Sequence, residues 1–249
     1  MFVTDKFAFV HLPRTGGTFI IEVIKKFFPS ACEIGHHLPL QHIPAKYRKL
    51  PILGSVRNPW DFYVSLYHYL SIKNPESTLA TWMSERGTVG FQESTRNLLN
   101  FGANGKRLDA LIDMLPEWVD YSKRQIPNIS KAATRKMRDT GLGYYSSRFA
   151  EMFGNADNVV FCKLENLKED LVAFFDQIGA ATEELRDYVL LLDRKNISAH
   201  LHYSTYYSPE LAELVFVREG PIVERFDYRF EQLFSEQDPK PTAQNSQPT

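Results

Sequence analysis

The chain has 249 residues, 43% of them hydrophobic and 24% charged, which is ordinary for a globular protein and enough to bury one sizeable core. A formal net charge of −1 gives no general attraction to nucleic acid or anionic membranes, and no apolar run approaches the ~18 residues that span a bilayer. The two cysteines and the absence of a signal-peptide pattern lead us to expect a cytoplasmic protein.

Strand-like and helix-like segments alternate along the chain. A short apolar run at 7–12 predicts a buried strand, and the apolar face of 18–28 predicts a helix that Pro29 ends. Asn58 and Pro59 are typical of a helix start. The remaining expectations are strands at 51–56 and 158–163 and helices at 58–71, 165–178, 183–192 and 209–218. This alternation predicts an α/β fold with a parallel sheet that has helices on both faces.

Two regions depart from this alternation. Residues 74–143 contain scattered Gly, Asn and Pro and no strand pattern, which predicts short helices on loops. Such an insertion either covers an acceptor site or only packs on the sheet. Residues 235–249 are polar and rich in proline, which predicts a disordered tail. We therefore expect a single domain over 1–234 followed by this tail.

The first anion-binding candidate is the turn Pro13-Arg14-Thr15-Gly16-Gly17-Thr18 between the first strand and the first helix. The free N–H groups of a first helical turn and the helix dipole favour an anion. Gly16 and Gly17 permit a close backbone approach, the two threonines add hydroxyl donors, and Arg14 adds a forked cation. The Walker pattern G-x-x-x-x-G-K-[ST] is missing, and the alternative reading is a tight turn that binds nothing.

The second candidate is Arg57-Asn58-Pro59-Trp60-Asp61-Phe62-Tyr63-Val64-Ser65, where Arg57 ends a strand. Asp61 and Ser65 are four residues apart and share a helix face near Arg57. An arginine and a hydroxyl at this strand end form a second anion clamp. Two such sites on successive strand–helix units indicate a ligand with phosphates at both ends.

Together the two segments resemble the sulfotransferases that use 3′-phosphoadenosine 5′-phosphosulfate (PAPS), in particular the bacterial and glycan-type members. P-R-T-G-G-T at 13–18 is similar to that family's 5′-phosphosulfate loop, usually written P-K-T-G-G-T, and R-N-P-W-D-F-Y-V-S at 57–65 is similar to its 3′-phosphate motif. The resemblance implies a P-loop-like α/β domain with PAPS as the sulfuryl donor and no metal. It covers the α/β core well and 74–143 poorly.

The resemblance also implies roles for individual residues. Arg14, Thr15, Gly16, Gly17 and Thr18 would hold the 5′-phosphosulfate, and Arg57 and Ser65 the 3′-phosphate. Further 3′-phosphate contacts are expected from Arg194, Lys195 and Ser198. The family usually has lysine at the position of Arg14. Because an arginine with a pKa above ~12 is a poor general acid, we expect Arg14 to stabilise charge on the leaving group electrostatically.

The general base is expected in Gly35-His36-His37-Leu38, which lies between the two motifs. A histidine accepts a proton near neutral pH, and family members place one in the corresponding segment. We align His37 with it and keep His36 as the near alternative. Structural histidines, a metal site with His42 and a glutamate base are the competing readings.

The sequence thus predicts in-line transfer of a sulfuryl group from PAPS to a hydroxyl or amine on a saccharide, a lipid or a small molecule. The alternative is a non-catalytic nucleotide- or phosphate-binding protein of the same fold. A kinase-like phosphotransferase is disfavoured because the Walker lysine and a magnesium motif are missing.

Overall fold

The structure is a computed structural model that describes residues 1–154, 156, 158–193 and 201–231. A five-stranded sheet in the order β3-β1-β2-β4-β5 forms its centre. The strands are β1 (Phe2–Val3), β2 (Ala8–Phe9), β3 (Cys32–Glu33), β4 (Ile52–Val56) and β5 (Val159–Lys163). The predicted tail at 235–249 lies outside the described residues.

The α/β class is confirmed, with one difference in the sheet. Strands β2, β4 and β5 are parallel as predicted, with Ala8 opposite Ile52 and Ile52 opposite Val159. Strands β1 and β3 add an antiparallel edge to the sheet, which was not predicted. Both have only two residues, and β3 is exposed, so neither carries a readable hydrophobic alternation.

The five predicted helices are present around this sheet as α1 (Gly17–Phe27), α2 (Pro59–His68), α8 (Leu167–Gln177), α9 (Glu183–Leu191) and α10 (Pro209–Arg218). Two further helices, α7 (Tyr144–Phe153) and α11 (Gly220–Arg225), were not predicted. Helix α2 continues as a π-helical turn, Tyr69–Lys73. Single 3-10 turns occur at Leu40–His42, Ala45–Tyr47, Leu164–Asn166 and Tyr203–Tyr206.

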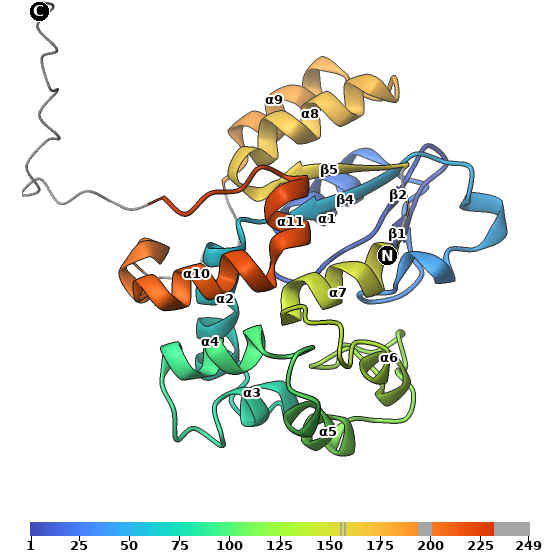
Figure 1. The fold of residues 1–249 in the computed structure, drawn as a ribbon. Coiled ribbons are helices and arrows are strands. Elements are labelled where there is room, and N and C mark those ends of the chain that lie inside the picture. The colour runs from blue at the N-terminus through green and yellow to red at the C-terminus, as the bar shows by residue number, and fades with distance from the viewer. Residues whose placement is uncertain (155, 157, 194–200, 232–249) are drawn as a thin grey trace, which may run out of the picture.

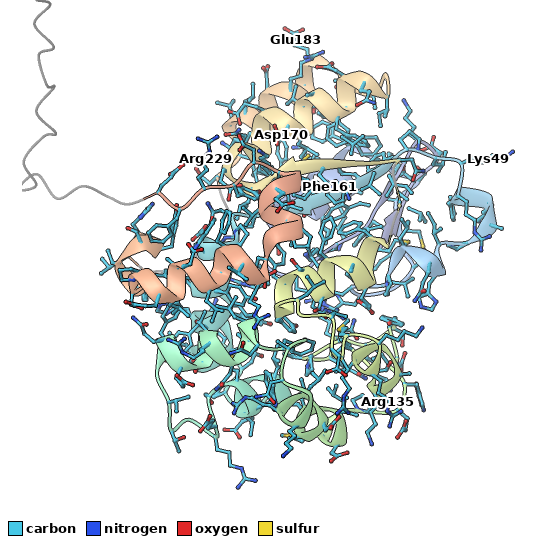
Figure 2. All side chains as sticks on the ribbon, in the orientation of Figure 1. Lys49, Arg135, Phe161, Asp170, Glu183 and Arg229 are labelled. Atoms are coloured by element: carbon cyan, nitrogen blue, oxygen red, sulfur yellow. The ribbon has the colours of Figure 1, made fainter. Side chains whose placement is uncertain are left out.

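Side-chain alternation along the strands builds a core on each face of the sheet. Phe7, Phe9 and Leu53 point into one core with α1, α8 and α9, whereas Ala8 and Val10 point into the other with α2 and α7. Figure 1 shows α8 and α9 on one side of the sheet and α7 on the opposite side. Phe161 of β5 lies beside α11 (Figure 2), where its ring centroid is 5.2 Å from that of Phe226.

The predicted run of short helices at 74–143 is also present. It contains α3 (Thr78–Met83), α4 (Phe91–Leu99), α5 (Gly105–Met114) and α6 (Lys131–Arg135). These helices gather beyond α2 and α10, away from α8 and α9 (Figure 1). Helix α4 packs on both α2 and α10. No helix within the described ranges is both long and apolar enough to cross a membrane.

Candidate nucleotide and transfer site

The turn between β2 and α1 is shaped by its two glycines. Gly16 takes a left-handed φ of 89° at the N-cap of α1, which an L side chain rarely adopts. Gly17 faces the imidazole of His11: a Cβ built on Gly17 would lie 2.0 Å from Cδ2 of that ring. The backbone therefore stays close to the His11 ring, and the first N–H groups of α1 have no intrahelical partner.

The two threonines of this turn have different surroundings. Thr15 is fully buried; its hydroxyl donates to the carbonyl of Leu12 at 2.8 Å and lies 2.7 Å from Oγ of Ser55. The hydroxyl of Thr15 thus ties the turn to the end of β4, and its backbone N–H is what it offers an anion. Thr18 is exposed on the first turn of α1.

The second predicted motif is built as the sequence indicates. The side chain of Asn58 accepts from the backbone N–H of Trp60 at 3.0 Å, and Pro59 occupies the first turn of α2. Arg57 forms a forked ion pair with Asp61, with Nε at 2.8 Å and Nη2 at 2.7 Å from Oδ2. This pair holds the guanidinium over the first turn of α2.

The two motifs meet at the carboxyl ends of β2 and β4. The guanidinium of Arg14 donates to the hydroxyl of Ser65, at 2.6 Å from Nη2, and its Cζ lies 4.7 Å from the ring centroid of Tyr69. Arg57 Nη1 donates to the carbonyl oxygen of Arg14 at 3.3 Å. The guanidinium of Arg14 therefore lies on the buried hydroxyl of Ser65, and that of Arg57 lies on the backbone of Arg14.

The surroundings of Arg14 alter its electrostatics. Burial and, second, the positive charge of Arg57 lower the pKa of Arg14 to about 10. This value lies below the range expected for arginine from sequence, and the guanidinium is still charged at neutral pH. A bound anion would offset both the desolvation of the Arg14 cation and its repulsion from Arg57, so this arrangement favours an anion.

Two residues that the sequence did not identify as site residues fix the end of β4. The hydroxyl of Tyr145 accepts from the N–H of Arg57 at 2.9 Å and donates to its carbonyl at 3.1 Å. Glu165 accepts from the N–H of Asn58 at 2.7 Å. The backbone that presents Arg57 is thus held from α7 and from the segment after β5. Sequence spacing gives no signal for contacts across 88 and 107 residues.

A buried carboxyl supports Tyr145 in turn. Glu219 is fully buried; it accepts from the hydroxyl of Tyr63 and from the N–H of Ser146 at 2.6 Å. The backbone N–H of Tyr145 lies 3.3 Å from the Tyr63 hydroxyl. Burial raises the pKa of Glu219 to about 7. This carboxyl joins α2, α7 and the α10–α11 junction.

The histidine segment lies beside the turn rather than apart from it. The ring of His37 lies 4.4 Å from that of His11 and 4.0 Å from that of His36, measured between centroids. Nδ1 of His37 is 2.8 Å from the carbonyl oxygen of His11. Since a carbonyl only accepts, Nδ1 carries the proton and Nε2 keeps its lone pair. His11, which precedes the turn, was not predicted as a site residue.

Burial is the main cause of a lowered pKa at each of these histidines. It brings the pKa of His11 to about 3, lowers that of His37 well below 6.5, and lowers that of His36. All three are neutral at pH 7, the state in which an imidazole accepts a proton.

The insertion reaches the histidines through one loop. The N–H of His36 donates to the carbonyl of Tyr121 at 2.7 Å, and Nδ2 of Asn128 donates to the carbonyl of His36 at 2.5 Å. Arg148 of α7 donates to the carbonyl of Asn128 at 3.1 Å. The loop thus holds the backbone of His36.

A pocket of about 610 Å³ opens beside His36. Thr18 and Lys25 of α1, together with His11, His36 and Arg124, are among the residues that line it. The exposed end of the turn at 13–18 and a candidate base therefore share one cavity.

Three of the predicted site residues cannot be placed in the site. Arg194, Lys195 and Ser198 fall outside the described residues, so their predicted phosphate contacts remain predictions. Among the residues that the structure describes, no group of three or more His, Cys, Asp or Glu side chains is placed to hold a metal ion.

Comparisons with known proteins give little beyond this geometry. No protein-family model matches the sequence, and no curated protein matches it. Among solved structures, the chain is similar to mouse sulfotransferase SULT7A1 complexed with PAP, at 15% identity and a TM-score of 0.47, over 89% of this chain and 84% of that chain. A similarity of this size carries no weight for ligand or activity, which rest on the site itself.

Proposed function

We propose that this protein is a sulfotransferase that moves the sulfuryl group of PAPS to a hydroxyl or amine acceptor. The observation that carries the proposal is the meeting of two anion-binding motifs at one edge of the sheet, with Arg14 against Ser65 and Arg57 against the carbonyl of Arg14. A nucleotide with a 5′-phosphosulfate and a 3′-phosphate has anionic groups at both ends and suits such a clamp.

In this proposal the turn at 13–18 binds the 5′-phosphosulfate through the free N–H groups of α1 and the exposed hydroxyl of Thr18. Arg57 and Ser65 bind the 3′-phosphate. Arg14 donates to the oxygen of the Ser65 hydroxyl, and the hydrogen of that hydroxyl can donate to a phosphate oxygen at the same time. We assign the charge of Arg14, a residue of the turn, to the phosphosulfate end.

Transfer requires one bond to form and one to break. The acceptor oxygen or nitrogen attacks sulfur in line, and the bond between sulfur and the bridging oxygen breaks. The electron pair stays on the 5′-phosphate of the departing 3′-phosphoadenosine 5′-phosphate (PAP), where Arg14 stabilises the developing charge. The acceptor proton passes to a neutral imidazole.

Both predicted bases suit this last step in different ways. His36 lines the pocket that Thr18 also lines. His37 has its Nδ1–H fixed on the carbonyl of His11, which leaves the lone pair of Nε2 in a defined orientation. We propose His36 or His37 as the base. The test is the rate of each alanine variant and of the double variant, measured where PAP affinity is unchanged.

A thermal-unfolding experiment tests the ligand. PAP without magnesium should raise the melting temperature by several degrees, and ATP with magnesium should not, because a ligand stabilises only the state that binds it. Arg57→Ala should abolish the PAP shift. Lys49→Ala, at the periphery of the molecule (Figure 2), should preserve it. Equal shifts with both nucleotides would contradict the proposal.

Turnover then separates an enzyme from a binding protein. Sulfate label from PAPS should pass to an acceptor, and free PAP should appear in equal amount. PAP binding without transfer to any hydroxyl or amine compound would leave a nucleotide-binding protein instead.

A further inference from the structure

We propose that the pocket of about 610 Å³ between α1 and His36 is the acceptor site, and that it takes a hydroxyl compound bearing an anionic group. This inference rests on the proposed sulfotransferase function and names the acceptor class that the function leaves open. A carboxylate or a sulfate ester on the acceptor would supply the anion.

The place of the pocket supports its role. Its wall contains Thr18, which belongs to the phosphate turn, and His36, a candidate base. A hydroxyl bound there has a proton acceptor and the phosphosulfate turn on the same cavity wall. That arrangement would bring the acceptor hydroxyl, the base and the phosphosulfate of the donor together.

The charges on the wall indicate the acceptor's chemistry. Glu22 accepts a hydrogen bond from the hydroxyl of Tyr188 at 3.2 Å, and Nζ of Lys26 lies 4.0 Å from the ring centroid of Tyr188. Lys25 is exposed, and its Nζ lies 5.5 Å from the ring centroid of Phe2. Arg124 is also exposed and forms no ion pair among the residues that the structure describes, whereas Glu33 on the same wall lies beside His36. Arg124 is therefore the cation of this wall that is placed to bind an acceptor's negative group.

This cation also acts on the candidate base. Burial has the largest effect on the pKa of His36, which it lowers, and the charge of Arg124 lowers it further. Glu33, whose Oε1 is 3.7 Å from Nδ1 of His36, raises this pKa, and the terminal ammonium lowers it. His11 and His37 are the other titratable groups against its ring. An anion on Arg124 would offset that cation's effect and make His36 a stronger base. An anionic acceptor would thus promote removal of its own proton.

Matched ligand pairs test the proposal by calorimetry on the PAP-loaded protein. The probes are methyl glucuronide against methyl glucoside, and para-hydroxyphenylacetate against para-hydroxyphenylacetamide. They distinguish a sugar source from an aryl source. Within at least one pair we expect the anionic member to bind about two- to fivefold more tightly, the range for exposed charge pairs.

Variants assign the effect to this pocket. Arg124→Gln should remove the preference for the anionic probe. Lys123→Gln is the control, because it removes the same charge from a neighbouring residue that is paired with Asp120, and it should keep the preference. In NMR titrations the anionic probe should raise the midpoint of His36 in the wild type and not in Arg124→Gln. A merely structural role of Arg124 would not produce that shift.

The proposal is overturned if no anionic probe binds at millimolar concentration, if both neutral members bind as well as their partners, or if the two glutamine variants behave alike. The proposed function fails separately, when PAP itself gives no stabilisation. In that case binding of the probes to the protein without PAP still reports whether the pocket takes anions.

Discussion

The guanidinium of Arg14 donates twice to the hydroxyl of Ser65, at 2.6 Å from Nη2 and 3.2 Å from Nε, across 51 residues of sequence. The two residues come from two different strand ends, one after β2 and one on the helix after β4. The contact places a cation on a hydroxyl predicted to hold a phosphate. Because Ser65 accepts from Arg14, the hydrogen of its hydroxyl can donate to an anion that lies beside the guanidinium.

Ser65→Ala should weaken PAP binding by about 10- to 150-fold, the effect of losing one hydrogen bond to a charged group. Isothermal calorimetry measures it. Ser122→Ala, an exposed serine of the insertion, is the matched control and should bind PAP normally. An unchanged affinity in Ser65→Ala would remove this residue from the phosphate site.

Arg14→Ala should lower kcat about 10²- to 10³-fold, because the charge that opposes the developing phosphate anion is lost. Arg14→Lys retains a cation and should stay within about tenfold of the wild type, since only the forked geometry changes. Steady-state transfer of labelled sulfate measures both. Near-normal turnover in the alanine variant would refute the electrostatic role.

Gly17→Ala should destabilise the fold by about 1–3 kcal/mol, as overpacking does, because the new methyl would lie 2.0 Å from Cδ2 and 2.1 Å from Nε2 of His11. Removing the imidazole should relieve the clash. We therefore expect the double variant with His11→Ala to lose less stability than the sum of the two single variants in urea unfolding. Strict additivity would show that His11 is not what excludes a side chain at Gly17.

Glu219 should make stability depend on pH. Burial raises the pKa of this carboxyl from 4.5 to about 7, so between these values the unfolded chain has released a proton that the folded chain keeps. The free energy of unfolding should therefore fall as pH rises through this window, by up to about 3 kcal/mol. Glu219→Gln, which does not titrate, should flatten that slope in denaturant titrations at pH 4.5 and 7. If the wild type and Glu219→Gln showed the same slope, the pH dependence would come from other groups.

Tyr145→Phe should leave the N–H and the carbonyl of Arg57 without the hydroxyl that now bonds both. We expect a loss of about 1–3 kcal/mol in stability and weaker PAP binding, because the backbone that presents Arg57 is released. Tyr144→Phe, at the adjacent position of α7, is the control. The same PAP affinity in both variants would limit Tyr145 to a structural role.

The sequence predicted well wherever local chemistry decides the structure. Asn58 and Pro59 begin α2 as expected, and α10 matches the predicted range 209–218. The two motifs place Arg14 and Ser65 after neighbouring parallel strands, and the structure has Arg14 in contact with Ser65 and Arg57 in contact with the carbonyl of Arg14. Parallel strand ends at one edge of a sheet explain this proximity, and the phosphate-binding roles stay predictions.

The parts of the fold and the site that the sequence did not predict depend on contacts that leave no local sequence pattern. Tyr145, Glu165 and Glu219 support the site across 73 to 156 residues. The antiparallel edge consists of strands of two residues, too short for any periodicity. His11 offered a weak signal, a histidine at the end of a buried strand just before a glycine turn, which its packing on Gly17 explains only in three dimensions.

The helix that carries Ser65 is anchored from the far end of the chain. Nε1 of Trp60 donates to the carbonyl of Ala212 at 3.0 Å, and Nδ2 of Asn58 donates to that of Arg229 at 3.1 Å. During synthesis, at about 5–20 residues per second, this segment emerges about ten seconds or more before its anchors do. The nascent chain therefore exposes Trp60 and the unanchored start of α2 until α10 and the segment after α11 have been made.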